Sequence, residues 1–546
     1  MTAAPTSRPA SAAVGAALDR FRWLRLALAA LAGAGVAAGF APYEQDILLV
    51  AGLALLVVCL DGVSARTGAI LGAVFGGVFT LLLTPWLRRV GTDAWILICL
   101  LQAVFYAAYG AGHAVLRRWP TWPVLAACWW VAIEAVRTRV PFGGFPWGRL
   151  AFSVPDGLFE AWPRWVGVPV TSGLVFLVGC LVAAGVIARV RRSSVPSAAV
   201  PLLSAGLFAA LSPALPTGLA HADDGEDRGR TVTVALVQGN VPGTGAEGLG
   251  EQRAVVANHV EATRTYADAV DVGDAEPADL VIWPENGSDI DPFTDPEVGR
   301  EIQSAVDAVA VPTLIGAILD GPEAGQGQNT GIAWTPQGGA GERYVKQHLV
   351  PFGEYIPFRS QLAPYISRLD QIPRDMVPGD EPGVLELGSV LVGDMICFDV
   401  AYDDVVRAAG AAVSDGGSQL LVVQTNNATY LGTGQPQQQW EISQVAAIQT
   451  GRDLAVASIN GISGVASADG ETVVQGRSGV SQVLTEQVRL ASGATWGARA
   501  GGWLELAVGV LGAGLVLAGV LSRRGRAGMP ATRARGSDPA PVLETR

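Results

Sequence analysis

The sequence is almost without lysine and has little histidine. Of its 37 basic residues 36 are arginine, so Lys346 is the single lysine among 546 residues. A chain that uses arginine wherever a positive charge suffices indicates that its one ammonium does something that a wide, planar guanidinium cannot do. Chemistry that relies on a histidine cluster has few candidates, because the sequence holds four histidines: His113, His221, His259 and His348.

Cysteine is also scarce, with five in the whole chain. Cys397 lies in the polar part of the sequence, directly after an apolar run that is typical of a buried strand. In an oxidising compartment it would have no disulfide partner in that part, which makes it a candidate reactive thiol. An inert core cysteine is the alternative. The other four lie inside long apolar runs, where cysteine behaves as a small buried hydrophobe: Cys59, Cys99, Cys128 and Cys180.

Acidic residues are nearly absent from the first 221 residues, which hold 8 of the 49. Residues 222–496, in contrast, hold 38 acidic and 14 basic residues, a balance of −24. Charge of this sign excludes nucleic acid as a partner. Half of all residues are hydrophobic and the mean hydropathy is +0.35, which makes the chain too apolar for an ordinary soluble enzyme.

Eight apolar runs indicate membrane spans, since several approach the length of about 20 residues that crosses a bilayer. The runs lie near residues 24–42, 47–60, 67–87, 94–115, 122–137, 165–188, 196–212 and 503–522. With seven spans before residue 221 and one after, most arginine clusters fall on one side, which the positive-inside rule makes cytoplasmic. These clusters are Arg20 to Arg25, Arg117 and Arg118, Arg189 to Arg192, and Arg523 to Arg526. Four arginines fall on the other side: Arg88, Arg89, Arg137 and Arg139.

This topology predicts five segments along the chain. They are a disordered cytoplasmic start (residues 1–20), a transmembrane domain of about seven helices (21–221), an extracytoplasmic domain (222–496), a final transmembrane helix (497–522) and a disordered cytoplasmic tail (523–546). An odd number of spans before the polar domain places that domain outside the cytoplasm and both termini inside.

The sequence pattern of the polar domain predicts strands that alternate with helices. Strands are expected at 231–237, 279–283, 312–319, 330–335, 343–346, 389–397, 420–425 and 454–459, and helices at 251–270, 298–309, 402–412 and 437–450. Such alternation predicts an α/β fold in which helices cover the faces of a sheet.

Three polar residues stand at the ends of predicted strands: Glu285, Lys346 and Cys397. Strand ends are where α/β folds gather their sites. Individually, each has an ordinary reading as a solvated turn, a surface charge or a core filler. Together they supply what acyl transfer through a thioester needs, namely a thiol, a carboxylate base and a cationic donor for the oxyanion. A Cys-His dyad with His348, two residues from Lys346, is the alternative.

The motifs around these residues resemble the nitrilase superfamily with its Glu-Lys-Cys triad. They are Trp283-Pro284-Glu285, Lys346 followed by Pro351-Phe352-Gly353-Glu354-Tyr355, and Gly393-Asp394-Met395-Ile396-Cys397-Phe398-Asp399. The flanking spans, and the stretch Gly143-Gly144-Phe145-Pro146-Trp147, narrow the resemblance to the apolipoprotein N-acyltransferases. The resemblance implies a nitrilase-like α-β-β-α sandwich inserted in an eight-helix transmembrane bundle.

The resemblance also implies a ping-pong reaction without cofactor or metal. Cys397 would take an acyl chain from a phospholipid as a thioester and pass it to the α-amine of a diacylated apolipoprotein. Glu285 would be the general base, Lys346 would stabilise the tetrahedral intermediate, and Glu354 would support the site. The expected substrate contacts are Phe398, whose N–H would be a second oxyanion donor, Tyr430, Trp283, Asn426 and Trp147. The expected setting is a multi-pass protein of the cell membrane, with the protein a monomer.

Two stretches depart from the family pattern, and both are expected near the substrate mouth: Asn426-Asn427-Ala428-Thr429-Tyr430 and Gly434-Gln435-Pro436-Gln437-Gln438-Gln439. Asp399 stands where a glutamate is common. Segments 355–366 and 376–384 could form arms that reach the lipid, or could be ordinary loops. A membrane-tethered hydrolase with the same triad remains an alternative function. A transporter is disfavoured, because few ionisable residues, such as Glu134 and His113, lie in the spans.

Overall fold

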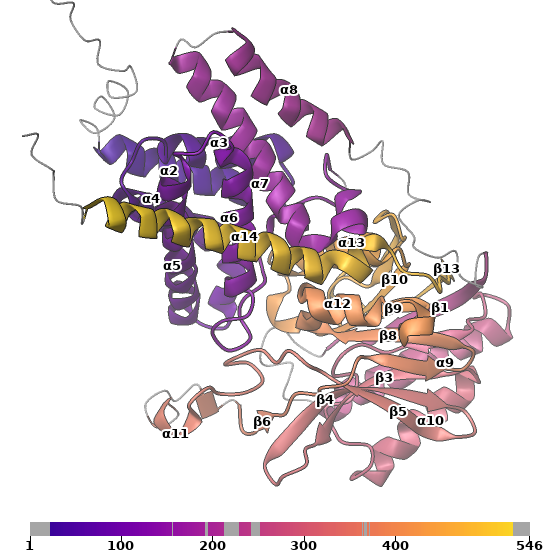
Figure 1. Ribbon diagram of the computed structural model, residues 1–546. Helices are drawn as coiled ribbons and strands as arrows, with labels where there is room; N and C mark the ends of the chain where they lie inside the picture. The colour runs from indigo at the N-terminus through magenta and orange to yellow at the C-terminus, as the bar shows by residue number, and fades with distance from the viewer. Residues whose placement is uncertain are drawn as a thin grey trace, which may run out of the picture.

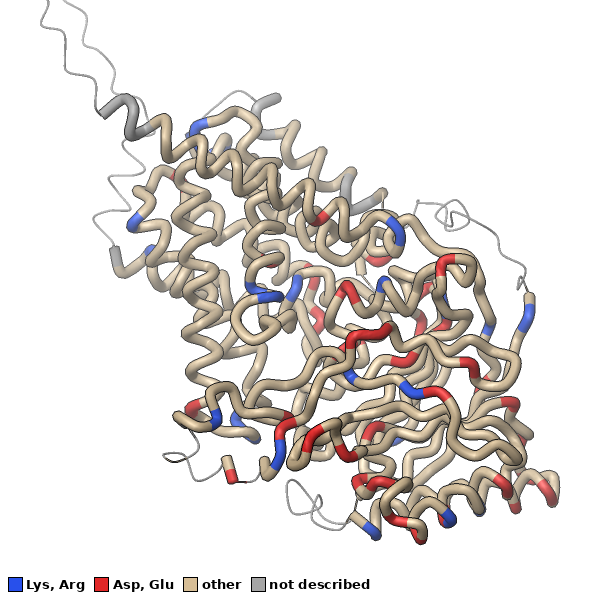
Figure 2. Tube along the Cα trace, turned by 60° about the horizontal axis from the view of Figure 1, so that its bottom comes forward, with Lys and Arg blue, Asp and Glu red and all other residues tan. Residues whose placement is uncertain are grey.

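The computed structural model describes residues 22–155, 157–191, 195–211, 229–241, 252–362, 364, 369–370 and 372–527. The predicted disordered start (1–20) and most of the predicted tail (528–546) lie outside these residues. Figure 1 shows two parts, a group of long helices and an α/β part, with the last helix α14 returning along the helical group. Charge follows the same division, because acidic residues gather on the α/β part in Figure 2.

The helical part contains all eight apolar runs as helices. Their bounds are α2 Arg22–Ala37, α3 Asp46–Cys59, α4 Ala65–Leu83, α5 Thr92–Leu116, α6 Trp122–Arg137, α7 Trp162–Val190, α8 Val195–Leu211 and α14 Trp496–Ala527, with short 3₁₀ turns η1 Pro85–Arg89 and η2 Leu150–Ser153. Four of them are long and apolar enough to cross a membrane: Ala65–Leu83, Thr92–Leu116, Trp162–Val190 and Trp496–Ser522. Small residues let neighbouring helices approach closely, since a Cβ on Gly72 of α4 would collide with the Tyr106 carbonyl of α5.

The α/β part contains two sheets. The first has the strand order β13-β1-β2-β3-β4-β5, with β6 beside β4, and the second has the order β12-β11-β10-β9-β8-β7. The strands are β1 Thr231–Gln238, β2 Leu280–Ile282, β3 Thr313–Asp320, β4 Gln326–Thr335, β5 Gly339–Val345, β6 Asp375–Met376, β7 Val384–Leu387, β8 Val390–Ile396, β9 Leu420–Thr425, β10 Leu454–Ser458, β11 Gly464–Ala466, β12 Thr472–Gln475 and β13 Gln482–Arg489. The helices are α9 Gln252–Asp271, α10 Pro296–Val309, α11 Arg359–Leu362, α12 Asp403–Ala409 and α13 Gln435–Thr450, and the 3₁₀ turns are η7 Cys397–Ala401, η8 Val413–Asp415 and η9 Ala428–Tyr430.

The two sheets face each other across a shared apolar core. Alternate residues of β1 show how the strands divide their side chains: Val234 and Leu236 point into this core, whereas Ala235 and Val237 pack under α9 and α10. The opposite face of the second sheet is covered by α12 and α13, whose apolar residues are continuous with the core of the helical part. The predicted α/β class is therefore confirmed, with four layers in the order helix, sheet, sheet, helix.

Helix α13 lies between the second sheet and α7. Fifteen of its 16 residues are buried, and five of these fifteen buried residues are glutamine. Gln438 shows how this is possible, because all its polar atoms are satisfied. Its Nε2 donates to the carbonyls of Ala41 and Leu83 at 3.0 Å each, and its Oε1 accepts from the indoles of Trp86 at 3.0 Å and Trp147 at 2.8 Å.

Several elements differ from the expectation from sequence. Strands β6, β7, β11, β12 and β13 were not predicted, and the helix expected at 402–412 is shorter, ending at Ala409 before Gly410. The β13 and β12 strands carry mixed, partly exposed side chains without a clear period of two. Their place in the sheets comes from pairing with distant partners, such as β13 with β1.

Candidate active site

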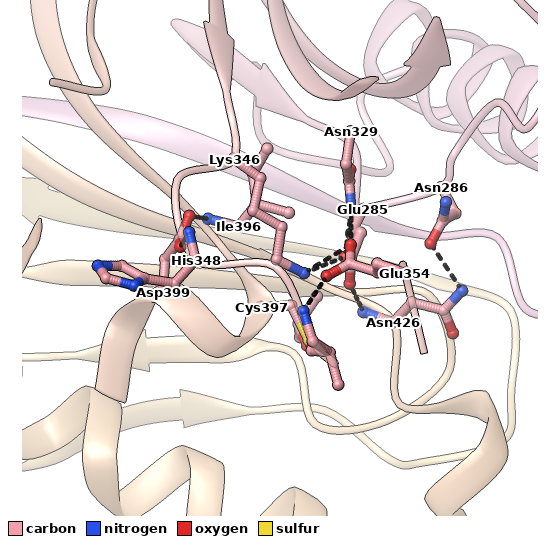
Figure 3. A network of polar contacts seen from close by, with 12 residues as sticks. Glu285, Asn286, Asn329, Lys346, His348, Glu354, Ile396, Cys397, Asp399 and Asn426 are labelled. Carbon is pink, nitrogen blue, oxygen red and sulfur yellow. Dashed lines mark hydrogen bonds and ion pairs between the residues drawn. The ribbon is translucent and has the colours of Figure 1, made fainter. Parts of the chain in front are cut away.

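Three strand ends bring Glu285, Lys346 and Cys397 together at one edge of the sandwich (Figure 3). Glu285 follows β2, Lys346 follows β5, and Cys397 follows β8 of the other sheet. The Nζ of Lys346 lies 3.1 Å from Oε1 of Glu285. Both carboxylate and ammonium act on the Cys397 thiol electrostatically, so the three predicted residues share one site.

Glu285 is almost fully buried at 5% exposure, and three donors hold it. Its Oε1 accepts from Lys346 and, at 2.7 Å, from the side-chain amide of Asn329. Its Oε2 accepts from the backbone N–H of Asn426 at 2.8 Å. Asn426 in turn donates its side-chain amide to Asn286 at 3.1 Å. The carboxylate is thus fixed in orientation by a residue inside β4 and by the residue that follows β9.

Glu354 is a second carboxylate on the same ammonium. Its Oε1 lies 3.0 Å from Lys346 Nζ and accepts from Asn329 at 2.9 Å, while its Oε2 accepts from the Val350 N–H at 2.8 Å. Lys346 itself is 1% exposed. Burial opposes its charge, but Glu285 and Glu354 outweigh burial and keep the pKa of Lys346 well above its ordinary value.

Cys397 begins a tight turn after β8. Its φ is +54°, a left-handed conformation that a residue with a side chain adopts only under constraint. Gln439 of α13 donates to the Cys397 carbonyl at 3.2 Å, and the Thr425 hydroxyl donates to Sγ at 3.4 Å. Burial and then Glu285 raise the pKa of the thiol to about 12, while Lys346 opposes them. The resting thiol is therefore protonated and needs a base.

Asp399 lies in the same turn, and its buried carboxylate accepts three hydrogen bonds. Its Oδ2 accepts from the Tyr344 hydroxyl at 2.8 Å and from the Ile396 N–H at 3.3 Å, and its Oδ1 accepts from the His348 N–H at 2.9 Å. The carboxylate thereby ties the nucleophile turn to the strand that carries Lys346.

Comparison with known proteins gives the family. Residues 32–181 match the family model of the apolipoprotein N-acyltransferase N-terminal domain, and residues 233–498 match that of carbon-nitrogen hydrolases. An amidase from Nesterenkonia sp. of known structure is 20% identical, with a TM-score of 0.34 over 48% of this chain and 91% of that one. The apolipoprotein N-acyltransferase of Methylococcus capsulatus is 28% identical over 74% of this chain and 75% of that protein. That of Mycolicibacterium smegmatis is 33% identical over 90% of this chain and 85% of that protein. This chain belongs to the apolipoprotein N-acyltransferase family. It is accordingly an enzyme, and its long apolar helices fit a membrane protein.

His348 is turned away from the nucleophile in this family member. Its ring stacks on Tyr402 with centroids 3.6 Å apart, and its Nε2 lies 3.5 Å from Oδ2 of Asp404. Figure 3 shows the ring directed away from Cys397. The geometry therefore gives the alternative Cys-His dyad no support.

An aromatic wall lies beside the nucleophile of this acyltransferase-family chain. Trp147 stacks on Phe398 with centroids 5.7 Å apart and an angle of 11°. Trp86 contacts Trp147 at 5.3 Å and Tyr430 at 5.2 Å, each edge to face. The predicted Phe398, Tyr430 and Trp147 thus belong to one cluster, whose rings come from both parts of the chain. Trp86 was not among the predicted residues.

Trp283 does not join this wall. Its indole is fully buried in the core under α9 and α10, 5.4 Å from the His259 ring, and it donates to the Thr263 hydroxyl at 3.0 Å. Trp283 directly follows β2 and continues the alternation of that strand, so its side chain points toward α9 and α10 together with Val281. This position gives no support to the predicted contact between the Trp283 side chain and the substrate. Its carbonyl accepts from Gln424 instead.

Sequence reasoning missed the amides that orient the acyltransferase-family triad. Asn329 donates to both Glu285 and Glu354 from inside β4, and Gln439 reaches Cys397 from α13. The sequence offered no signal for Asn329, because it stands in the polar first half of β4, Gln326-Gly327-Gln328-Asn329-Thr330. The glutamine run of α13 was expected at the substrate mouth, but Gln435, Gln438 and Gln439 are buried and hydrogen-bonded within the protein.

Proposed function

We propose that the site moves an acyl chain from a phospholipid to the α-amine of an S-diacylglyceryl cysteine, through a thioester on Cys397. The observation that carries this reaction is the buried contact of Lys346 with Glu285 beside that thiol. The match to apolipoprotein N-acyltransferases supports this reaction, and we propose a residue for each step.

The first step is attack of the Cys397 sulfur on the ester carbonyl. Glu285 takes the thiol proton, which is necessary because the pKa of the thiol is raised. A carbon–sulfur bond forms, the carbon–oxygen bond of the ester breaks, and Glu285 returns the proton to the departing lysophospholipid oxygen. Lys346 and the backbone N–H of Phe398 are the proposed donors to the oxyanion.

The second step is attack of the acceptor amine on the thioester. Glu285, now ionised again, accepts a proton from the attacking nitrogen, the carbon–sulfur bond breaks, and Glu285 passes that proton to the departing sulfur, which restores the thiol. Glu354 and Asn329 keep Lys346 and Glu285 in place during both steps. Phe398, Tyr430, Asn426 and Trp147 are the proposed neighbours of the substrate.

We further propose that the eight helices form a transmembrane bundle with the α/β part outside the cytoplasm. At one end of the helical part, Asp61 pairs with both Arg117 and Arg191, which joins the ends of α3, α5 and α7. At the other end, the segment after α2 and the end of α4 contact Gln438 of the α/β part. Arg117 and Arg191, which belong to two of the four arginine clusters, therefore lie at the end away from the α/β part, and by the positive-inside rule this supports the proposed orientation.

The proposed domain limits are those expected from sequence: a helical domain at 21–221, a catalytic domain at 222–496 and a last span at 497–522. Phe142 of the helical part and Phe358 of the predicted arm are both exposed and meet edge to face at 5.8 Å. We propose that this pair faces lipid; residues 363 and 365–368 of the arm lie outside the described residues.

The test is incubation of the purified chain with a phospholipid labelled in its acyl chain, with and without a diacylated lipopeptide. We expect label on Cys397 without the peptide and on the peptide amine with it. Cys397→Ser is the matched control. Free fatty acid released at the same rate whether or not the peptide is present would favour the hydrolase alternative.

A further inference from the structure

A fourth carboxyl group, fully buried, lies next to the proposed catalytic residues without a cation of its own. Glu285 and Glu354 share Lys346, and Asp399 accepts three hydrogen bonds. Asp394 of β8, three residues before Cys397, is fully buried. Within the described part of the chain, neither of its oxygens accepts a hydrogen bond. An ionised carboxylate in that position would be costly.

Asp394 lies between the two sheets, opposite a position of β4 that carries no side chain. Gly331 of β4 faces it, and a Cβ on that glycine would collide with the carboxyl group of Asp394. The same Cβ would come within 2.8 Å of Oε1 of Gln424, which is also fully buried. Oδ2 of Asp394 and Oε1 of Gln424 therefore both face the space left by the missing side chain.

The orientation of Gln424 is fixed by a carbonyl. Its Nε2 donates to the carbonyl oxygen of Trp283 at 2.6 Å. Turning the amide over would place two acceptor oxygens at that distance, which the hydrogen-bond chemistry of an amide excludes. Oε1 must therefore face Asp394, and among the described residues Oε1 has no donor. One proton on Asp394 would give Oε1 of Gln424 a donor and would remove a charge that no cation pairs.

We propose that Asp394 is a positioning residue held as a neutral carboxylic acid that donates its O–H to Gln424. The bond keeps Gln424 on the carbonyl of Trp283, two residues before Glu285. It thereby fixes the turn that presents the proposed base, and it keeps a further negative charge away from the Cys397 thiol. The inference rests on the proposed function for the role of Glu285, but the protonation state can be measured without turnover.

The electrostatic surroundings agree with the geometry. Burial raises the pKa of Asp394 well above its ordinary value, and Asp399 and Glu285 act in the same direction. The neighbouring Met395 N–H lowers the pKa but does not prevail, and it does not meet the geometry of a hydrogen bond to either oxygen of Asp394. Tyr344, from the facing sheet, is a neutral neighbour whose own pKa is raised by burial.

The first experiment measures the charge of Asp394 through the thiol. The full chain in detergent is alkylated over a range of pH, as wild type and as Asp394→Asn, with Cys397→Ser to subtract the other cysteines. We expect wild type and Asp394→Asn to be alkylated at Cys397 at rates within about twofold of each other between pH 7 and 8, because no charge is removed there. A rate about tenfold or more higher in Asp394→Asn at that pH would show an ionised Asp394 and overturn the proposal.

The second experiment measures positioning. We expect Asp394→Ala and Gln424→Leu each to slow thioester formation roughly tenfold or more, because each leaves a buried polar group unpaired. The double variant should lose no more than the worse single variant, and Asp394→Asn should retain most activity because its amide can donate to Gln424. Fully multiplicative losses in the double variant would refute action through Gln424. If the alanine variant does not fold, the asparagine variant still decides the charge.

Discussion

Replacing Lys346 by arginine tests why the chain keeps a single lysine. The ammonium occupies a space 3.1 Å from Glu285 and 3.0 Å from Glu354, and it is 1% exposed. A guanidinium keeps the charge but is wider and presents its donors as a flat fork. It would fit only by displacing one of the two carboxylates or by withdrawing from the oxyanion.

The expected magnitude follows from these contacts. Loss of one well-placed oxyanion donor costs about 10²–10³ in rate, and forcing a larger group into a packed site costs about 1–3 kcal/mol of folding free energy. We therefore expect Lys346→Arg to form the thioester about 10²–10³ times more slowly. Its melting temperature should fall by only a few degrees.

The assay is the rate at which label from a phospholipid appears on the protein after rapid mixing. Arg343→Lys is the matched control, since Arg343 is exposed on the same strand and rests over the Phe293 ring. It should react at the wild-type rate. If Lys346→Arg also reacts at that rate, a simple positive charge is sufficient and the argument from the single lysine is wrong.

Three further changes have defined outcomes. Cys397→Ala should carry no acyl adduct by intact-protein mass spectrometry while remaining inserted in membranes; an adduct there would mean another nucleophile. Because the pKa of the thiol is raised to about 12, alkylation of the resting wild type should climb about tenfold per pH unit from pH 7 to 10, since the thiol is protonated below its pKa. A plateau near pH 8 would contradict the raised pKa. Gln438→Leu should lower the free energy of unfolding by about 2–4 kcal/mol, because it leaves the buried partners of Gln438 without a hydrogen bond. Gln437→Leu, at the neighbouring position, should leave the free energy of unfolding unchanged. Calorimetry compares the two variants.

The strand ends could be predicted from sequence, whereas the groups that orient them could not. Glu285 and Cys397 each follow an apolar run, so the pattern of the chain marks them directly. Asn329 lies inside β4, and its partners Glu285 and Glu354 are 44 and 25 residues away in sequence. No local pattern encodes such a contact, because it depends on the pairing of β4 with its neighbours.

The helices could be predicted for a similar reason, and their contacts could not. Each apolar run is long enough to be read from composition alone. The attachment of the α/β part to them depends on single polar side chains, such as Gln438, whose partners lie in three separate segments before residue 148. Arg137 is another case: it holds the loop that carries Trp147 by donating to the carbonyls of Phe145 and Trp147.

The start of α13 connects the helical part to the nucleophile through two consecutive residues. Gln438 binds the helical part, and Gln439 binds the Cys397 carbonyl at 3.2 Å and the Thr425 hydroxyl at 3.0 Å. That hydroxyl is the one that donates to the thiol. A shift of the helices must therefore move the nucleophile turn or break a buried hydrogen bond, which costs free energy. One of the two stretches expected to depart from the family pattern thus lies where the position of the helices and the geometry of the thiol are coupled.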